Sequence, residues 1–147
     1  MPRNLHAEKT SMNILQPPDW AAPRGYSNGT MTEMQAGSRL LFVGGQIGWN
    51  AQCEFETDDF GEQVAQSLRN VVAVLAAGDA RPEHITRMTW YVSDRDEYVA
   101  SYRKIGEHYR AIIGRHFPAM TAVEVARLVE PRAKVEIEVT AVVPAAR

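Results

Sequence analysis

The fold is decided by FPAMTAVEVARLVEPRAKVEIEVTAVV, residues 117–143, in which two strands can be recognised from alternation alone. In the second strand every other residue is apolar. One side carries Val135, Ile137, Val139 and Ala141, and the other carries Lys134, Glu136, Glu138 and Thr140. Because successive side chains point to opposite faces of a strand, this pattern predicts one dry side and places Glu136 and Glu138 together on the other.

The first strand of this stretch alternates less cleanly. One side carries Thr121, Val123, Val125 and Arg127, and the other carries Met120, Ala122, Glu124, Ala126 and Leu128. Residues 128–134 are predicted to form the turn between the two strands, because Pro131 lies among them and proline cannot donate to a β-ladder.

Upstream, glycines bound two short apolar segments that predict strands at about 30–35 and 39–45. The segment GGQIGWNAQ, residues 44–52, is then predicted to leave the sheet as a loop. Gly44 and Gly45 at its start would allow another group to approach the main chain closely.

Two helices are predicted from apolar residues at helical spacing. The first spans 58–77 and ends before Gly78; the second begins at Asp94, with Glu97 in capping-box position, and ends at Gly114. Between them, 81–92 reads as a turn and a strand. The apolar stripe of the first helix is Phe60, Val64, Leu68, Val71, Val72 and Leu75; that of the second is Tyr98, Tyr102, Ile105, Tyr109, Ile112 and Ile113. We interpret these tyrosines, together with Trp90, as core residues.

The order strand, strand, helix, strand, helix, strand, strand predicts an α+β fold with a mixed sheet and both helices on one face. The other face would then be bare. We expect it to carry Met120, Ala122, Ala126 and Val142 beside Glu124, Glu136 and Glu138. That surface is too apolar for a monomer, so we expect self-association and a site where subunits meet.

Composition limits the classes of function. The chain has 147 residues, 45% of them hydrophobic and 23% charged, which indicates a single domain, residues 20–147, after an extended arm at 1–19. A net charge of −2 argues against a nucleic-acid or anionic-membrane partner. Neither a membrane span nor a secretory leader is recognisable, so the cytoplasm is the expected location.

Cysteine and histidine usage predicts neither a disulfide nor a metal site. Cys53 is the single cysteine, and the histidines, His6, His84, His108 and His116, lack paired spacing. No metal or cofactor is expected.

Several motifs together resemble the Rid family, the reactive-intermediate deaminases, also called YjgF-like or L-PSP endoribonuclease-like proteins. The motifs are VGGQIG at 43–48, NVVAVLAAGDARPEHITRMTWYVSD at 70–94, FPA at 117–119, VEVARL at 123–128 and VEIEVTAV at 135–142. The resemblance runs from about Tyr26 to Val143. It implies a chorismate-mutase-like fold and a homotrimer with a central sheet barrel. It also implies clefts between subunits in which imines or enamines are hydrolysed to a carbonyl compound and ammonia without a cofactor.

The chain departs from the family at the residue expected to hold the substrate carboxylate. The family has an arginine where this sequence has Met120, and methionine cannot donate to a carboxylate. Gly44 stands in place of a frequent serine, Gly106 in place of an asparagine and Ala122 in place of a cysteine. The matching positions are Tyr26, Gly45, Gln46, Thr121 and Glu136.

The resemblance makes Glu136 the candidate for positioning water, and the alternative is a strand carboxylate paired with Lys134 or Arg127. Tyr26 would flank a planar substrate or simply pack. The Gly45 main chain and the Thr121 hydroxyl would anchor a carbonyl or carboxylate; the alternatives are a β-bulge and an ordinary strand threonine.

Further candidates surround this set. Arg24 could supply the missing positive charge, whereas Arg127 is interpreted as structural. Trp49 could line the opening or pack in the core, and His116 could reach the cleft mouth or lie on the surface.

The sequence therefore leaves three functions open. The first is a cofactor-free imine or enamine deaminase whose substrate is larger or less amino-acid-like than usual, because Met120 makes the site more apolar. The second is a trimer that binds or senses a small metabolite without chemistry. The third, an endoribonuclease, is the weakest because the chain is acidic and has no dense basic run.

Overall fold

A computed structural model of the chain describes residues 12–146. Residues 1–11 of the predicted arm lie outside the described residues. The strands are β1 (Met12–Leu15), β2 (Gly29–Thr32), β3 (Arg39–Ile47), β4 (Ile85–Val92), β5 (Ala119–Glu124) and β6 (Val135–Val143). The helices are α1 (Phe60–Ala77), the 3₁₀ turn η1 (Pro82–His84), α2 (Arg95–Ala100) and α3 (Tyr102–Ile112).

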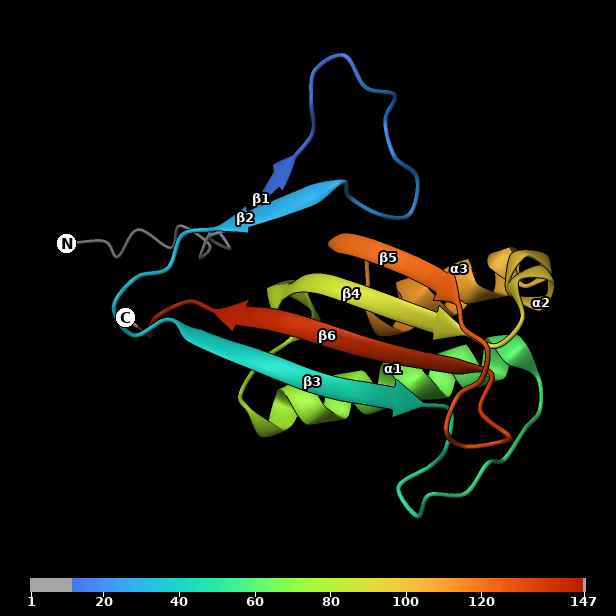
Figure 1. Ribbon diagram of the computed structural model, residues 1–147. Coiled ribbons are helices and arrows are strands. Elements are labelled where there is room, and N and C mark those ends of the chain that lie inside the picture. The colour runs from blue at the N-terminus through green and yellow to red at the C-terminus, as the bar shows by residue number, and fades with distance from the viewer. Residues whose placement is uncertain (1–11, 147) are drawn as a thin grey trace.

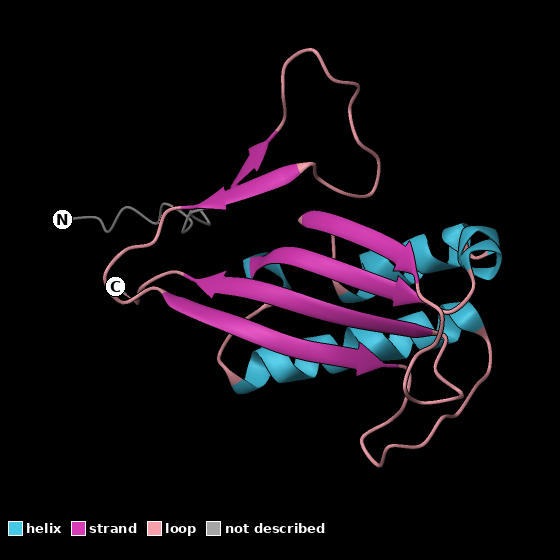
Figure 2. Ribbon diagram, in the orientation of Figure 1, coloured by secondary structure: helices cyan, strands magenta, loops and turns pink. Residues whose placement is uncertain are grey.

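The main sheet has four strands in the order β3-β6-β4-β5, and the helices cover one of its faces (Figures 1 and 2). β6 pairs antiparallel with both β3 and β4, whereas β5 pairs parallel with β4. The predicted α+β class with a mixed sheet is confirmed. The two C-terminal strands are not partners, however, because β4 lies between them.

The core lies between the helices and the inner face of β6 and β4. Val135, Ile137, Val139 and Ala141 are all buried, as the alternation predicted. The α1 stripe packs on them through Phe60, Val64, Leu68, Val71 and Leu75. Each such side chain contributes roughly 1.5–3 kcal/mol by leaving water.

Aspartate side chains cap the N-termini of α1 and α2. The Asp59 carboxylate accepts from the Glu62 amide, so α1 starts at Phe60 rather than at 58. Asp94 likewise accepts from the Glu97 amide at 2.9 Å. The second predicted helix is broken at Ser101 into α2 and α3.

The glycine segment after residue 43 does not leave the sheet at once. β3 continues to Ile47, and the register against β6 shifts between Val43 and Gln46. Gly44 and Gly45 therefore form an irregularity inside the strand, and the loop starts at Gly48. The prediction of a loop from 44 onward was wrong by four residues.

A second, smaller sheet lies on the side of the main sheet away from the helices (Figure 1). It pairs β1 with β2, so the arm contains a strand that the sequence did not indicate, and β2 ends at Thr32 rather than at 35. The Thr30 hydroxyl donates to the Thr86 carbonyl oxygen at 2.7 Å and ties this hairpin to the start of β4. Within 12–146, no helix combines the length and apolarity that a membrane crossing requires.

Candidate active site

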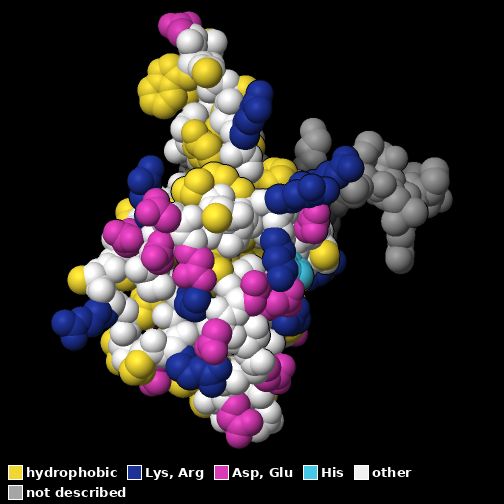
Figure 3. Space-filling view, turned by 90° about the vertical axis from the view of Figure 1, so that its right-hand side faces the viewer, with side chains coloured by type: hydrophobic (Ala, Val, Ile, Leu, Met, Phe, Trp, Pro, Cys, Tyr) yellow, Lys and Arg dark blue, Asp and Glu magenta, His cyan; other side chains and the backbone are white. Residues whose placement is uncertain are grey.

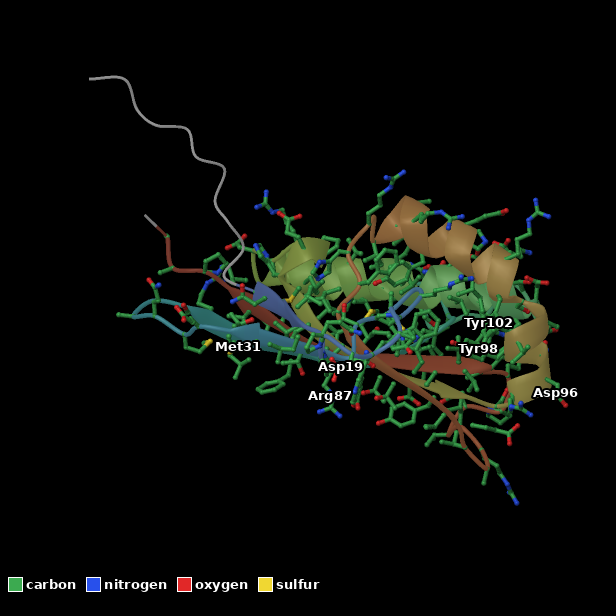
Figure 4. All side chains as sticks on the ribbon, turned by 90° about the horizontal axis from the view of Figure 1, so that it is seen from above. Asp19, Met31, Arg87, Asp96, Tyr98 and Tyr102 are labelled. Carbon is green, nitrogen blue, oxygen red and sulfur yellow. The ribbon has the colours of Figure 1, made fainter. Side chains whose placement is uncertain are left out.

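A cavity of about 590 Å³ opens beside β5, between α3 and the segment that precedes β2. Its wall is largely aromatic. The aromatic residues are Tyr26, Trp90, Tyr98, Tyr102, Tyr109 and Phe117. The other lining residues are Arg24, Gly25, Ile105, Gly106, Arg110, Met120 and Ala122. Figure 4 shows Tyr98 and Tyr102 on the helix side of the sheet, whereas Arg87 points from the opposite side.

Hydrogen bonds to main-chain carbonyl oxygens hold the walls of the cavity together. The Ser27 amide donates to the Pro118 carbonyl oxygen at 3.0 Å, and the Ser27 hydroxyl donates to the carbonyl oxygen of Phe117. These bonds fix Tyr26 beside β5. On the other side, the Tyr109 hydroxyl donates to the His116 carbonyl oxygen, and the Tyr109 ring stacks on Phe117 at 5.6 Å.

Two tyrosines of the cavity, Tyr98 and Tyr109, are hydrogen-bonding groups rather than acids or bases at neutral pH. Burial raises the pKa of Tyr98 and also that of Tyr109, so both phenols stay protonated. The Trp90 side chain is 2% exposed, and its Nε1–H has no acceptor among the described residues. The cavity thus offers aromatic surface and a few hydrogen-bond donors.

Two arginines on the cavity wall are free of acidic partners. Neither Arg24 nor Arg110 forms an ion pair or a hydrogen bond with any residue from 12 to 146. The other basic residues of α3 behave differently, since Arg103 pairs with Glu107 and Lys104 pairs with Asp59 and Glu62. Positive charge is therefore available in the cavity even though Met120 is neutral.

The candidate carboxylate lies elsewhere, at the β3–β6 irregularity. A Cβ atom placed on Gly45 would be 2.1 Å from Oε1 of Glu136, so the carboxylate packs on the bare main chain of that glycine. The Gln46 side chain beside it donates to the Gly44 carbonyl oxygen at 3.0 Å. At position 45 the absence of a side chain is required by this contact.

Glu136 accepts no hydrogen bond and forms no ion pair within the described part of the chain. Lys134, the partner in the alternative interpretation, instead contacts Glu97 at 2.6 Å. The neighbouring Glu138 accepts from the Tyr91 hydroxyl at 2.7 Å, and this bond raises the pKa of Tyr91. Of the two glutamates on this face, Glu136 is the one available to a ligand.

The remaining candidates are placed as follows. Thr121 is exposed on the open face, opposite Thr89 of β4. Trp49 is half-buried, packs on Phe55 and lies on the loop after β3, so it is not part of the aromatic cavity. The His116 ring lies 2.7 Å from the Ile85 carbonyl oxygen.

The structure separates the predicted site residues into two groups. Tyr26, Met120 and Ala122 meet in the cavity, on the helix side of β5, because Met120 pairs with Met88 and Ala122 with Trp90. Gly45 and Glu136 meet at the β3–β6 irregularity, and the Glu136 side chain belongs to the open face.

Placing Met120 and Ala122 on the open face was therefore wrong. Glu124 also lies in helix-side register and accepts from the Arg95 amide at 2.9 Å, and Ala126 lies beyond the end of β5. The large apolar residues exposed on the open face are Leu40, Phe42 and Val123, and Phe42 is 75% exposed.

Sequence reasoning missed Trp90, Tyr98, Tyr102 and Arg110 as cavity residues. The tyrosine stripe and Trp90 were assigned to the core. Trp90 and Tyr109 are buried in the core as predicted, whereas Tyr102 is 55% exposed. The available signal was chemical: tyrosines occupied stripe positions where aliphatic residues would fill a core, and Gly106 interrupted the same helix.

A family model described as Endoribonuclease L-PSP matches residues 20–143. The chain belongs to this family, the Rid or YjgF family. The motifs quoted from the sequence therefore identified it correctly.

Curated members of the Rid family resemble the chain over most of their length. A RutC family protein of Aquifex aeolicus is 32% identical over 103 residues, which cover 70% of this chain and 80% of the relative. The 2-iminobutanoate/2-iminopropanoate deaminase of Escherichia coli K12 is 33% identical over 106 residues, 70% of this chain and 79% of the relative.

Solved Rid structures share the fold. YyfB of Yersinia pestis, a conserved Rid protein of unknown function, has a TM-score of 0.77 at 27% identity, covering 89% of this chain and 98% of YyfB. The YjgF gene product of E. coli has a TM-score of 0.61 at 32% identity, covering 80% of this chain and 87% of YjgF. The YjgF-like α+β fold is thus established, and the family supports an imine deaminase activity at the level of reaction class.

Proposed function

We propose that the protein hydrolyses a reactive imine or enamine in clefts between the subunits of a homotrimer. In this reaction R–C(=NH)–COO⁻ and water give R–CO–COO⁻ and ammonia, so the C=N bond is replaced by C=O and no electrons are exchanged with a cofactor. The similarity to relatives named as 2-imino acid deaminases supports the reaction class. The substrate is not the usual one, because Met120 replaces the cation that would hold a small carboxylate.

The observation that carries the proposal is the Glu136 carboxylate, which has no hydrogen-bond or ion-pair partner within residues 12–146 and packs against Gly45 on the open face. A carboxylate in this position accepts a proton from water as the water oxygen attacks the imine carbon. It then returns this proton to nitrogen and gives a carbinolamine. A second proton passes through the same carboxylate from the carbinolamine hydroxyl to nitrogen, so that the C=O bond forms as the C–N bond breaks and ammonia leaves. General acid–base assistance of this kind contributes about 10²–10⁴-fold.

Assembly supplies the rest of the site. Leu40 and Phe42 are exposed apolar residues at the β3 edge of the open face, and Val123 is exposed at its β5 edge. We assign the β3 pair to the interface, because neighbouring exposed apolar side chains favour association. In a trimer closed through this face, Glu136 of one subunit would approach the cavity that Tyr26 lines in a neighbour. Recognition and water activation then come from different subunits.

The direct test follows the consumption of a 2-imino acid generated in the assay by an amino-acid oxidase, with semicarbazide trapping the imine that remains. The wild-type protein should lower semicarbazone formation, and Glu136→Gln should abolish the effect. Glu138→Gln is the matched control, since Glu138 lies two residues away on the same face and already bonds to Tyr91. Equal activity of Glu136→Gln and wild type would refute the proposed role of Glu136.

A binding or regulatory trimer is the second candidate, and Met120 is the observation that favours it. It predicts tight, saturable binding of a carboxylate together with no imine consumption by the wild type, by Met120→Arg or by Glu136→Ala. An endoribonuclease fits less well, because acidic and basic side chains are intermixed on the face seen in Figure 3 and the net charge is −2.

A further inference from the structure

We propose that the cavity selects 2-imino carboxylates with a planar aromatic side chain, and that Arg110 holds their carboxylate in place of residue 120. The imine part of this proposal rests on the deaminase function above. The assignment of an aromatic carboxylate rests on the cavity alone.

The wall of the cavity matches an aromatic ring in size and chemistry. A volume of about 590 Å³ is in the range of pockets that hold drug-sized ligands, far more than a three-carbon acid fills. Tyr26, Tyr102 and Phe117 present ring surfaces, and ring pairs stabilise one another in offset or edge-to-face contact. The T-shaped pair of Tyr98 and Tyr102, with centroids 5.1 Å apart, already has this geometry.

Met120 completes an apolar wall rather than a charged one. Its thioether is polarisable and contacts aromatic rings favourably. An arginine at this position would add a charge where the ring of the substrate must lie. The substitution therefore changes which part of the ligand faces β5.

The positive charge of the cavity comes from α3 rather than from β5. Gly106 leaves its turn of the helix bare, and Arg110 lies one turn further along, with Nη1 3.7 Å from the position that a Gly106 Cβ would take. Arg110 lines the cavity and has no acidic partner in residues 12–146. A guanidinium without an acidic partner can bind a carboxylate through two parallel hydrogen bonds. Arg24 adds a second positive charge from the opposite wall.

Trp90 gives an independent indication that the cavity binds a ligand with hydrogen-bond acceptors. Trp90 lines the cavity, and its indole N–H is buried without an acceptor among the described residues. Buried donors in proteins nearly always have an acceptor. A carboxylate or imine ligand brings acceptor atoms to this wall.

The test measures binding of phenylpyruvate, the stable product of the proposed aromatic substrate, by calorimetry on the full-length protein. We expect it to bind more tightly than pyruvate. Arg110→Gln should weaken phenylpyruvate binding about 10- to 100-fold, the loss typical of one charge-assisted contact. Binding of phenylacetone, which lacks the carboxylate, should not change.

Arg103→Gln is the matched control, because Arg103 lies on the same helix and its charge is paired with Glu107. Thermal unfolding of each variant verifies that the helix is intact. Unchanged phenylpyruvate affinity in a folded Arg110→Gln protein overturns the assignment of Arg110. Equal or tighter binding of pyruvate overturns the aromatic specificity.

The test of ligand binding is independent of the test of imine hydrolysis. Phenylpyruvate binding that depends on Arg110, with no imine consumed, would remove the deaminase function and leave the aromatic carboxylate site standing. Consumption of a small imine that depends on Glu136 but not on Arg110 would support the deaminase function and remove the aromatic carboxylate site.

Discussion

The aromatic cavity and the Gly45–Glu136 contact lie on opposite faces of one sheet, and they differ in almost every property. The cavity is built from four segments, namely 24–26, β4, the α2–α3 region and 117–122, and it contains tyrosine hydroxyls and two arginines without acidic partners in residues 12–146. The second site is a carboxylate on a bare main chain, surrounded by an exposed strand surface. In the proposed function, the residues that hold the ligand are therefore separate from the group that activates water.

The cause of this separation lies in the sheet order. β6 is central and its inner residues are buried under α1, so only its outer residues, Glu136 among them, remain available. β5 is an edge strand, and its residues are half-buried or exposed on both faces. A cavity can therefore form on the helix side of β5 but not on that of β6.

The largest expected effect comes from breaking the assembly that would unite the two regions. Phe42→Lys places a charge at the most exposed large side chain of the open face. We expect dissociation to monomers and turnover at background, because neither region acts alone. Sedimentation equilibrium measures the mass. Val74→Lys, on α1 at 41% exposure, is the control and should leave the mass unchanged. A wild-type monomer at micromolar concentration would contradict the trimer.

Glu136→Gln should come next, with kcat lower by about 10²–10⁴-fold, because the amide cannot accept the proton of the attacking water. Phenylpyruvate affinity should stay within about twofold of wild type, since the cavity is untouched. Steady-state kinetics and calorimetry on the same preparation separate the two effects. Loss of binding in this variant would mean that the regions are not separate.

Gly45→Ala should lower kcat by about 10- to 100-fold without removing any functional group. The new methyl would overlap Glu136 Oε1 and displace the carboxylate, and a shift of about 1 Å in a catalytic group costs on this order. Gly44→Ala is the matched control, because a Cβ there meets nothing within 4 Å. Equal kinetics of the two variants would show that the position of Glu136 is unimportant.

The smallest expected effect is on thermal stability, through the contacts that hold the cavity helix α3 against α1. Hydrogen bonds from Lys104 lower the pKa of Asp59 and of Glu62 and tie α3 to α1. Depressed carboxyl pKa values stabilise the fold above the unfolded values of about 3.9 and 4.3, and this contribution is lost as the pH falls through the folded values. The contacts are exposed, so Lys104→Met should lower Tm by only about 1–3 °C at pH 7. At a pH low enough to protonate both carboxyls in the folded protein, the two proteins should unfold at the same temperature. A difference in Tm that persists there would rule out the ion pairs as its cause.

Much of the fold followed from local pattern. The buried residues of β6, the α1 stripe and the caps at Asp59 and Asp94 were all predictable, because periodicity and capping depend on neighbours along the chain. Alternation also grouped Met120 with Ala122 correctly. It could not say which face of the sheet they occupy, since that depends on the partner strand, and the partner is β4 rather than β6.

Residue identity and spacing were enough to recognise the family, the two helical regions, most strands of the main sheet and the neutral side chain at Met120. The three-dimensional arrangement was needed to show that Arg110 and Tyr102 share a cavity with Tyr26, and that Glu136 packs on Gly45 on the opposite face. Those relations join residues 76 to 91 positions apart in the chain. They depend on strand order, and strand order is a property of long-range pairing that no local pattern contains.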